Sequence, residues 1–207
     1  KYAELSPDKQ AYPVVLNNIA MAHYLRNDPN GLKYSLQVVD IGTANGDPLL
    51  LYSGSFVTAY MYYLQGDPAT ALRYIETALA VGGNYIEYAE AYSLYANILA
   101  GLGRKSEAER YYKKALDVMA KAEHGEADAA ITWVNMAHLY EAWKEESESL
   151  VCGCMDQAIG LLNTPSLPRN GYYAFVCSKC APSFGYFGYF LEDADLKKRA
   201  KEIYERA

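Results

Sequence analysis

Apolar residues recur along most of the chain at intervals of three and four positions, which places them on one side of an α-helix. Segments 66–79 and 103–116 show this pattern most clearly, because they superpose without gaps at an offset of 37 residues. In both, the apolar positions fall at i, i+4, i+7 and i+8, as in Ala71, Ile75, Ala78 and Leu79. Two amphipathic helices at a fixed offset predict a repeat protein.

Each copy begins with a residue pattern typical of a helix start. In the first copy Asp67 precedes Pro68, which predicts an N-cap followed by a proline in the first turn of the helix. In the second copy Ser106 and Glu109 have the spacing of a capping box. Both copies are therefore predicted to be helices that follow a tight turn.

A second helical pattern precedes each copy, at residues 49–64 and 84–100, with Ala59 or Ala96 near its centre. Each repeat is therefore predicted to be a helix, a short turn and a second helix packed back on the first. Neither helix can bury its apolar face alone, so neighbouring hairpins must stack. The pattern extends in both directions and predicts one domain over residues 1–207. Its expected hairpins, about five, span residues 13–41, 49–81, 84–120, 126–162 and 171–207.

These residues resemble the tetratricopeptide repeat (TPR) family, whose repeat has 34 residues. The family places Trp, Leu, a small residue and Tyr on the first helix, Gly-Asp at the turn, and Ala, Tyr or Phe, and Ala on the second helix. The matching residues are Gly66, Asp67, Ala71, Ile75 and Ala78 in the second hairpin, Trp133, Met136, Ala137 and Tyr140 in the fourth, and Phe184, Phe187, Gly188 and Leu191 in the fifth. The resemblance implies an all-α, right-handed superhelical α-solenoid of the bacterial type with longer repeats.

In TPR arrays the first helices line a concave groove, and the resemblance assigns its positions in this chain. The residues expected to bind a peptide are Phe56, Tyr60, Tyr63, Asn97, His138, Glu141 and Tyr189. The aromatic residues would be anchors, and the amide and imidazole would be polar contacts. The expected groove holds no Lys or Arg, which argues against a clamp for a C-terminal carboxylate. The alternative is that many of these tyrosines only pack between helices.

Composition supports a folded protein that binds other proteins. The chain has 207 residues, of which 51% are hydrophobic and 21 are Tyr, a residue suited to half-exposed binding surfaces. Its net charge of −6 argues against nucleic acid as a partner. The apolar stretches are too short for a membrane span. Few cysteines favour a reducing cytoplasm, and a first residue other than Met leads us to expect a fragment of a longer chain.

Cysteine and histidine residues are the main candidates for chemistry. The pairs Cys152/Cys154 and Cys177/Cys180 suggest zinc, but helical residues two positions apart point to nearly opposite sides. Packing is therefore preferred to a metal site or a redox pair. The three histidines, His23, His124 and His138, lack metal-binding spacing, and the chain has no GxSxG motif. We therefore predict no metal, no cofactor and no enzymatic activity.

The sequence thus predicts a non-catalytic, cytoplasmic scaffold that binds a protein or peptide segment in an aromatic groove. One alternative is a regulatory or sensory TPR region of a larger bacterial protein, such as a transcriptional regulator. Another is a metal-dependent enzyme that uses the cysteine cluster. Homodimerisation through exposed terminal helices stays open, because the end helices of a repeat array have an uncovered face.

Overall fold

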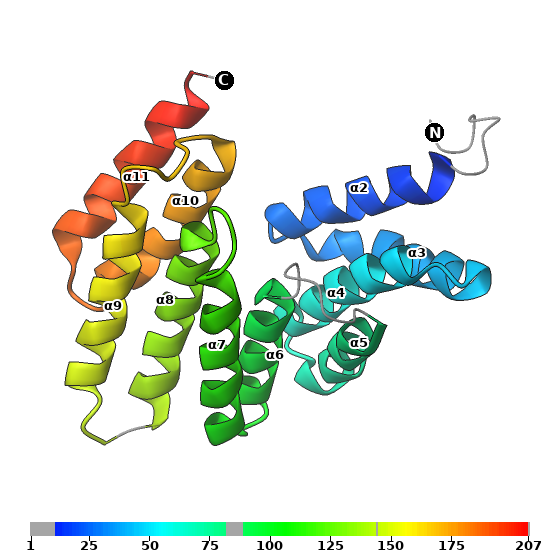
Figure 1. Cartoon of the computed structure of the whole chain (residues 1–207), viewed down its shortest axis with the longest axis horizontal. Coiled ribbons are helices and arrows are strands. Elements are labelled where there is room, and N and C mark those ends of the chain that lie inside the picture. The colour runs from blue at the N-terminus through cyan, green and yellow to red at the C-terminus, as the bar shows by residue number, and fades with distance from the viewer. Residues whose placement is uncertain (1–10, 82–88, 144, 207) are drawn as a thin grey trace. The chain divides into compact units, whose positions relative to one another are not determined.

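The computed structural model describes residues 11–81, 89–143 and 145–206. These residues form ten α-helices and one short 3₁₀ helix, and no strand occurs among them (Figure 1). The helices are α2 (Ala11–Leu25), η1 (Pro29–Gly31), α3 (Leu32–Asn45), α4 (Pro48–Leu64), α5 (Pro68–Val81), α6 (Ala89–Gly101), α7 (Lys105–Met119), α8 (Glu126–Trp143), α9 (Glu148–Leu162), α10 (Gly171–Tyr186) and α11 (Phe190–Tyr204). Residues 84–88 of the third expected hairpin and Ala207 of the fifth lie outside the described residues.

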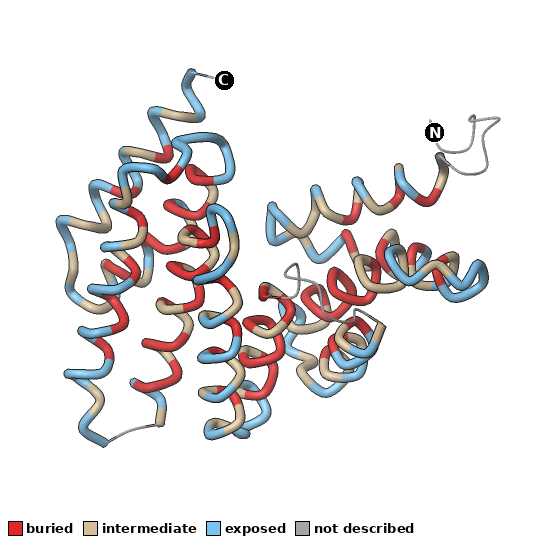
Figure 2. Tube along the Cα trace, in the orientation of Figure 1, coloured by how far each residue is buried: buried red, intermediate tan, exposed pale blue. Residues whose placement is uncertain are grey.

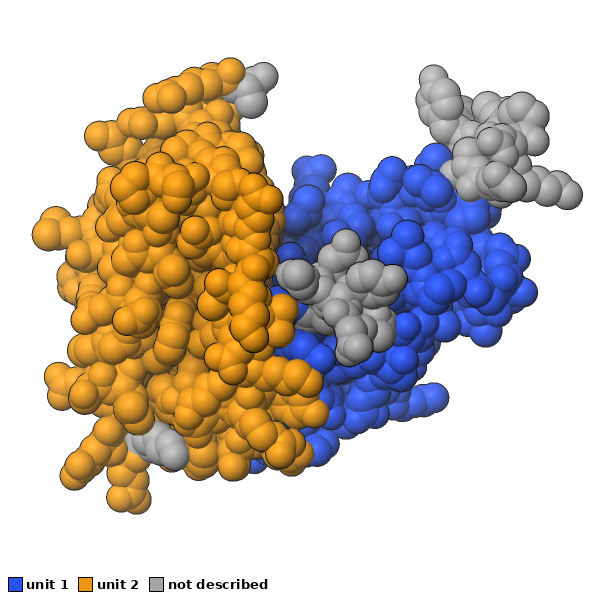
Figure 3. Space-filling model, in the orientation of Figure 1, with its two compact units in different colours: residues 1–104 blue, residues 105–207 orange. Residues whose placement is uncertain are grey.

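The chain divides into two compact units, Lys1–Arg104 and Lys105–Ala207 (Figure 3). Unit 1 contains α2 to α6, and unit 2 contains α7 to α11. Within unit 1 the most extensive helix contacts join α3 to α4 and α4 to α5, and within unit 2 they join α8 to α9 and α10 to α11. Helices that are consecutive in the chain therefore pack against one another within each unit.

One type of turn follows α2, α4, α6 and α10. A residue with a positive φ ends the helix: Asn27 (51°), Gly66 (76°), Gly103 (76°) and Gly188 (87°). The next residue donates its N–H to the carbonyl oxygen five residues earlier: Asp28 to His23 (2.9 Å), Asp67 to Tyr62 (3.0 Å), Arg104 to Leu99 (2.9 Å) and Tyr189 to Phe184 (2.8 Å). This is the Schellman arrangement, which favours glycine at the left-handed position.

The start of α5 has the predicted cap. The Asp67 carboxylate accepts the N–H of Thr70 at 3.0 Å, and hydrogen bonds from Thr70 lower the pKa of Asp67. Asp47 caps α4 in the same way, because it accepts the N–H groups of Leu49 and Leu50 at 3.0 and 3.1 Å. Aspartate before proline thus marks two α-helix starts in unit 1, and Asp28 before Pro29 marks the start of η1 in the same way.

The predicted capping box of Ser106 and Glu109 is wrong. Helix α7 begins at Lys105, so Ser106 already lies inside the helix, because the Gly103 turn brings the helix start forward. The Glu109 carboxylate instead contacts the Lys113 ammonium at 2.8 Å. A turn glycine therefore overrides a capping pattern that lies a few residues later.

Small residues near the middle of the first helix of each hairpin (α2, α4, α6, α8 and α10) allow close packing. The alanines at this place are all 0% exposed: Ala20, Ala59, Ala96, Ala137 and Ala181. In four of the five helices the alanine stands seven residues before the turn residue with a positive φ. Figure 2 shows many buried residues along α4 and α8, whereas α11 buries only Leu196 and Ala200. The core of each unit therefore lies around its first helices.

The fifth hairpin differs from the predicted register. Helix α10 runs without a break to Tyr186 with Pro182 inside it, and residues 187–189 form the turn before α11. Gly188 and Tyr189 therefore lie in the turn, and Leu191 lies on the second helix rather than the first. The physical reason is the left-handed φ of Gly188, which ends a helix readily because glycine has no Cβ.

Candidate functional site

In unit 1 the expected anchors Phe56 and Tyr60 belong to a packed aromatic cluster. They are 5% and 8% exposed. The Tyr24 ring of α2 meets both rings edge-on, with centroids 5.5 and 4.6 Å apart. Tyr52 stacks on Phe56 at 6.3 Å, and the Tyr60 hydroxyl donates to the Asn27 amide oxygen. The structure therefore differs from the expectation of exposed anchors, because Tyr24 covers these side chains and they hold α2 against α4.

The other two expected groove residues of unit 1 are half-buried. Tyr63 lies one turn beyond Tyr60 on α4, and its pKa is raised by burial. Asn97 lies on α6. Unit 1 thus brings Phe56, Tyr60 and Tyr63 to one side of α4, with most of the aromatic surface used in packing.

In unit 2 the expected residues His138 and Glu141 face α10. The His138 Nε2 lies 2.9 Å from the Ser183 hydroxyl, and its Nδ1 lies 3.8 Å from the Glu141 carboxylate. Tyr186 donates its hydroxyl proton to Glu141 at 2.7 Å, and the Phe187 ring centroid is 4.7 Å from the His138 ring. Burial lowers the pKa of His138, which favours the neutral imidazole at pH 7.

The same pair of helices carries more aromatic and polar groups toward the start of α10. Tyr172 donates its hydroxyl to Asp128 of α8, and burial raises the pKa of Asp128. Tyr172 stacks on Phe175 at 5.9 Å, and the Lys179 ammonium lies 5.4 Å from the Phe175 ring centroid. The α8–α10 face comprises Asp128, His138, Glu141, Tyr172, Phe175, Lys179, Ser183 and Tyr186.

Tyr189 does not belong to the α8–α10 face. Its hydroxyl donates to Asp156 of α9 at 3.4 Å, its ring meets Phe184 edge-on at 5.9 Å, and burial raises its pKa. Its assignment to the first helix of the fifth repeat was wrong, because the turn before α11 lies there. The residues missed in consequence are those of α10. The usable signal was Ala181, seven residues before Gly188, as Ala59 is before Gly66.

Ser183, His138 and Glu141 are arranged in the order of a serine hydrolase triad. The 3.8 Å separation of His138 and Glu141 is too long for a hydrogen bond. Ser183 also lies inside α10, where the backbone N–H groups bond to carbonyl groups of the helix itself and are not available to stabilise an oxyanion. The arrangement therefore fixes side-chain positions on the α8–α10 face and lacks the parts of a hydrolytic centre.

The four cysteines are free thiols in unit 2. Cys152 is exposed, whereas Cys154, Cys177 and Cys180 are buried. Burial raises the pKa of Cys154 and of Cys180 to about 12. Over the ranges 11–81, 89–143 and 145–206, no three His, Cys, Asp or Glu side chains form a group that could hold a metal ion. The buried thiols act as small apolar groups in the packing of α9 and α10.

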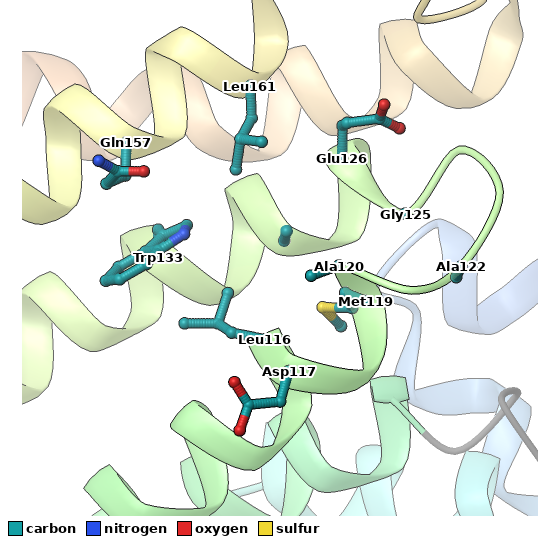
Figure 4. Close-up of a pocket in the computed structure, with 11 residues that line it drawn as sticks. Leu116, Asp117, Met119, Ala120, Ala122, Gly125, Glu126, Trp133, Gln157 and Leu161 are labelled. Carbon is teal, nitrogen blue, oxygen red and sulfur yellow. The ribbon is translucent and has the colours of Figure 1, made fainter.

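A cavity of about 480 Å³ lies among α7, α8 and α9. Leu116, Trp133 and Leu161 come from these three helices and face the same hollow, whereas the Glu126 carboxylate points away from the Trp133 indole (Figure 4). Asp117, Glu126 and Gln157 also line the cavity, so it combines apolar contact with polar groups. We rank it below the α8–α10 face because that face exposes tyrosine rings whose hydroxyls are held by hydrogen bonds.

Each unit is thus built from consecutive helices that pack in pairs around a buried alanine at a recurring position, which defines a helical-repeat protein. Residues 58–121 match the family model of the tetratricopeptide repeat. This match confirms, for that stretch, the resemblance seen in the sequence. No curated protein is significantly similar in sequence to the chain.

Solved structures share the fold. TPR-like repeats of kinesin light chain type from Podosopora anserina, described as nearly identical, align over 93% of this chain and 94% of theirs at 12% identity, with a TM-score of 0.57. A variant of those repeats aligns over 98% of this chain and 100% of its own, with a TM-score of 0.60. BtubC (BKLC) from P. vanneervenii aligns over 97% of this chain and 92% of its own at 17% identity, with a TM-score of 0.52. The predicted fold class, an all-α array of TPR-like hairpins, is confirmed. Among the described helices, none combines the length and hydropathy needed to cross a bilayer.

Proposed function

We propose that this chain is a non-catalytic protein-interaction module and that unit 2 binds a peptide segment of a partner protein on the α8–α10 face. The observation that carries the proposal is the exposure of aromatic rings beside fixed polar groups. Tyr186 is 65% exposed and Tyr172 is 39% exposed, and both hydroxyls bond to carboxylates of α8. Exposed tyrosine offers apolar area and a polar tip at a small cost in side-chain entropy.

The polar groups on this face suit a peptide backbone. The imidazole of His138 and the hydroxyl of Ser183 lie 2.9 Å apart on neighbouring helices, and both can donate and accept hydrogen bonds. Phe175 and Tyr186 lie on the same side of α10 and would contact apolar side chains of the peptide. The face also holds Lys179 above the Phe175 ring, a cation that the groove expected from sequence lacked. TPR-like repeats serve in general as protein-interaction scaffolds, and the fold supports the same role here.

A peptide library displayed on phage, selected against the wild-type chain, tests the proposal. The selected peptide should bind the Tyr186→Ser variant at least about tenfold more weakly, because exposed tyrosines often act as interface hot spots. Tyr204→Ser is the matched control, since Tyr204 is 52% exposed on α11 and lies outside the α8–α10 face. Circular dichroism would verify that both variants keep their helices. Equal affinity for the two variants would exclude the α8–α10 face as the binding site.

A further inference from the structure

Another cavity in unit 2, of about 280 Å³, lies between the loop after α9 and the last turns of α11. Its lining residues are Arg169, Tyr173, Arg199, Glu202, Ile203 and Arg206. Half of them are arginines, in a chain whose net charge is −6. We call this space the arginine cavity. Such a local excess of positive charge in an acidic protein needs a physical explanation.

Two of the arginines converge on the same groups. Arg169 Nη1 donates to the Leu162 carbonyl oxygen at 2.7 Å, and Arg199 Nη1 lies 3.5 Å from that oxygen. Arg199 also donates to the Tyr173 hydroxyl at 2.9 Å, and the Arg169 guanidinium lies 4.1 Å from the centroid of the Tyr173 ring. The two guanidinium groups are therefore close neighbours of like charge, and they repel each other.

The carboxylates nearby do not balance all of this charge. Asp195 pairs with Arg199 at 2.5 Å, and Glu202 lies 3.8 Å from Arg206. Arg169 forms an ion pair with no carboxylate in the described part of the chain, and its hydrogen bonds go to the carbonyl oxygens of Leu162 and Thr164. The arginines thus satisfy carbonyl groups at the end of α9, a structural role. One positive charge is nevertheless left without a counter-charge.

A guanidinium group has five N–H donors, so the bonds to carbonyl groups leave donors of Arg169 available to a ligand. Helix α10 begins at Gly171, two residues after Arg169, and the start of a helix carries a partial positive charge. The arginine side chains that line the cavity come from the loop after α9, from α11 and from the residues that follow α11. This arrangement suits a tetrahedral anion better than a flat carboxylate, because a phosphate group presents several oxygens to separate donors.

We propose that the arginine cavity binds a phosphate group, either free or carried as a phosphate monoester on a partner. At roughly 30 Å³ per water molecule, a volume of about 280 Å³ holds a phosphate group together with part of the side chain that carries it. The anion would neutralise Arg169 and reduce the repulsion between Arg169 and Arg199. This site is separate from the α8–α10 face, and its test does not depend on the peptide-binding proposal.

The test is a titration of the chain with sodium phosphate at constant ionic strength, followed by NMR of the arginine Nε–H groups in ¹⁵N-labelled protein. Sodium chloride serves as the reference salt. The signals of Arg169, Arg199 and Arg206 should shift with saturation, and the signal of Arg110 on α7 should not, because Arg110 lies outside the cavity. Equal shifts at Arg110 and at the cavity arginines would overturn the proposal.

Three variants make the test specific. Arg169→Gln should weaken phosphate binding by roughly tenfold, because it removes a charge-assisted donor, and the exposed Arg206→Gln by roughly threefold. Glu202→Gln should strengthen binding by roughly threefold, because it removes the carboxylate that lines the cavity. Arg110→Gln and Glu205→Gln are the matched controls outside the cavity. If Arg169→Gln folds poorly, the opposite effects of Arg206→Gln and Glu202→Gln on phosphate affinity still test the proposal. Unchanged phosphate affinity in both of these variants would overturn it.

The source of the phosphate is decided by a second ligand. A short peptide with one phosphoserine is compared with inorganic phosphate and with the same peptide carrying serine. Tighter binding of the phosphopeptide than of inorganic phosphate would identify a protein-borne group, and equal binding would identify free phosphate. Binding of the serine peptide as tight as that of the phosphopeptide would contradict recognition of phosphate on a peptide.

Discussion

Equivalent positions on α4 of unit 1 and α8 of unit 2, the first helices of their hairpins, have different surroundings. Tyr60 follows the buried Ala59 on α4, and His138 follows the buried Ala137 on α8. In unit 1 the Tyr60 ring is covered by Tyr24 of α2, with centroids 4.6 Å apart. In unit 2 the smaller His138 reaches Ser183 at 2.9 Å, and Tyr186 one turn along α10 stays 65% exposed.

The same position in the repeat therefore holds a covered side chain in unit 1 and a half-buried one in unit 2. Phe56 stands three residues before Ala59, and Val134 stands three residues before Ala137. The aromatic residues Phe56 and Tyr60 of α4 meet Tyr24 of α2 and are buried. On α10, by contrast, Tyr172 and Tyr186 stay exposed beside α8.

The largest effect is expected from Phe56→Ala in unit 1. Removal of a ring that is 5% exposed leaves a cavity beneath Tyr24 and should lower the free energy of unfolding by about 3–4 kcal/mol. Urea unfolding followed by circular dichroism measures the change. Tyr186→Ser is the contrasting variant in unit 2 and should cost less than about 1 kcal/mol. Similar losses in both variants would remove the difference between the two units.

Thiol reactivity should report on unit 2 alone, because residues 1–104 contain no cysteine. The exposed Cys152 should react quickly with an aromatic disulfide reagent at pH 8. The buried Cys154, Cys177 and Cys180 should react at least about a hundredfold more slowly, because burial limits access and raises the thiol pKa. The reaction followed by absorbance should show one fast and three slow equivalents. A second fast equivalent would contradict the packing described for α9 and α10.

Two glycine substitutions in unit 2 should change the free energy of unfolding in opposite directions. Gly188→Ala should cost about 1 kcal/mol, because the φ of +87° at the turn before α11 is unfavourable for a residue with a Cβ. Gly153→Ala should raise the free energy of unfolding by about 0.5–1 kcal/mol. Gly153 is exposed inside α9, and a Cβ there would meet open space. Thermal or urea unfolding measures both. A stabilising Gly188→Ala would disprove the register given for the last hairpin.

The smallest effect concerns pH and His138. Burial lowers its pKa below the ordinary 6.5, so the unfolded chain binds a proton more readily than the folded chain. The stability that the neutral imidazole contributes is present above about pH 6.5 and is lost as the pH falls through the lower folded pKa. His138→Gln should reduce the loss of unfolding free energy between pH 7 and pH 5 by less than about 0.5 kcal/mol, since the side chain is partly solvated. If the variant lost more unfolding free energy than the wild type between pH 7 and pH 5, the pKa of His138 would not be lowered by folding.

The elements set by local sequence were predictable. Gly66, Asp67 and Pro68 combine a left-handed turn, an N-cap and a first-turn proline, and α5 begins where this pattern places it. The periodicity of apolar residues also predicted an all-α chain whose helices pack in adjacent pairs. Such features depend on neighbours within one or two helical turns, so they can be inferred from a single sequence.

The register of the last hairpin and the burial of the aromatics could not be inferred with the same ease. The stretch after Ser183 holds two glycines, Gly185 and Gly188, among similar aromatic residues, and the spacing of seven residues from Ala181 to Gly188 is the one sequence signal that separates them. Burial of Tyr60 depends on Tyr24, which is 36 residues away in sequence and on another helix. Sequence therefore predicted which residues lie on the first helices of unit 1 but not which of them solvent can reach.

The contrast between packed and exposed aromatics is tested most directly by mapping a bound peptide with NMR. The peptide selected against the wild-type chain is added to protein labelled at its tyrosine and histidine side chains. The account predicts shifts at His138, Tyr172 and Tyr186 with little change at Tyr24 and Tyr60. Large shifts at Tyr24 and Tyr60, with none at Tyr186, would contradict it.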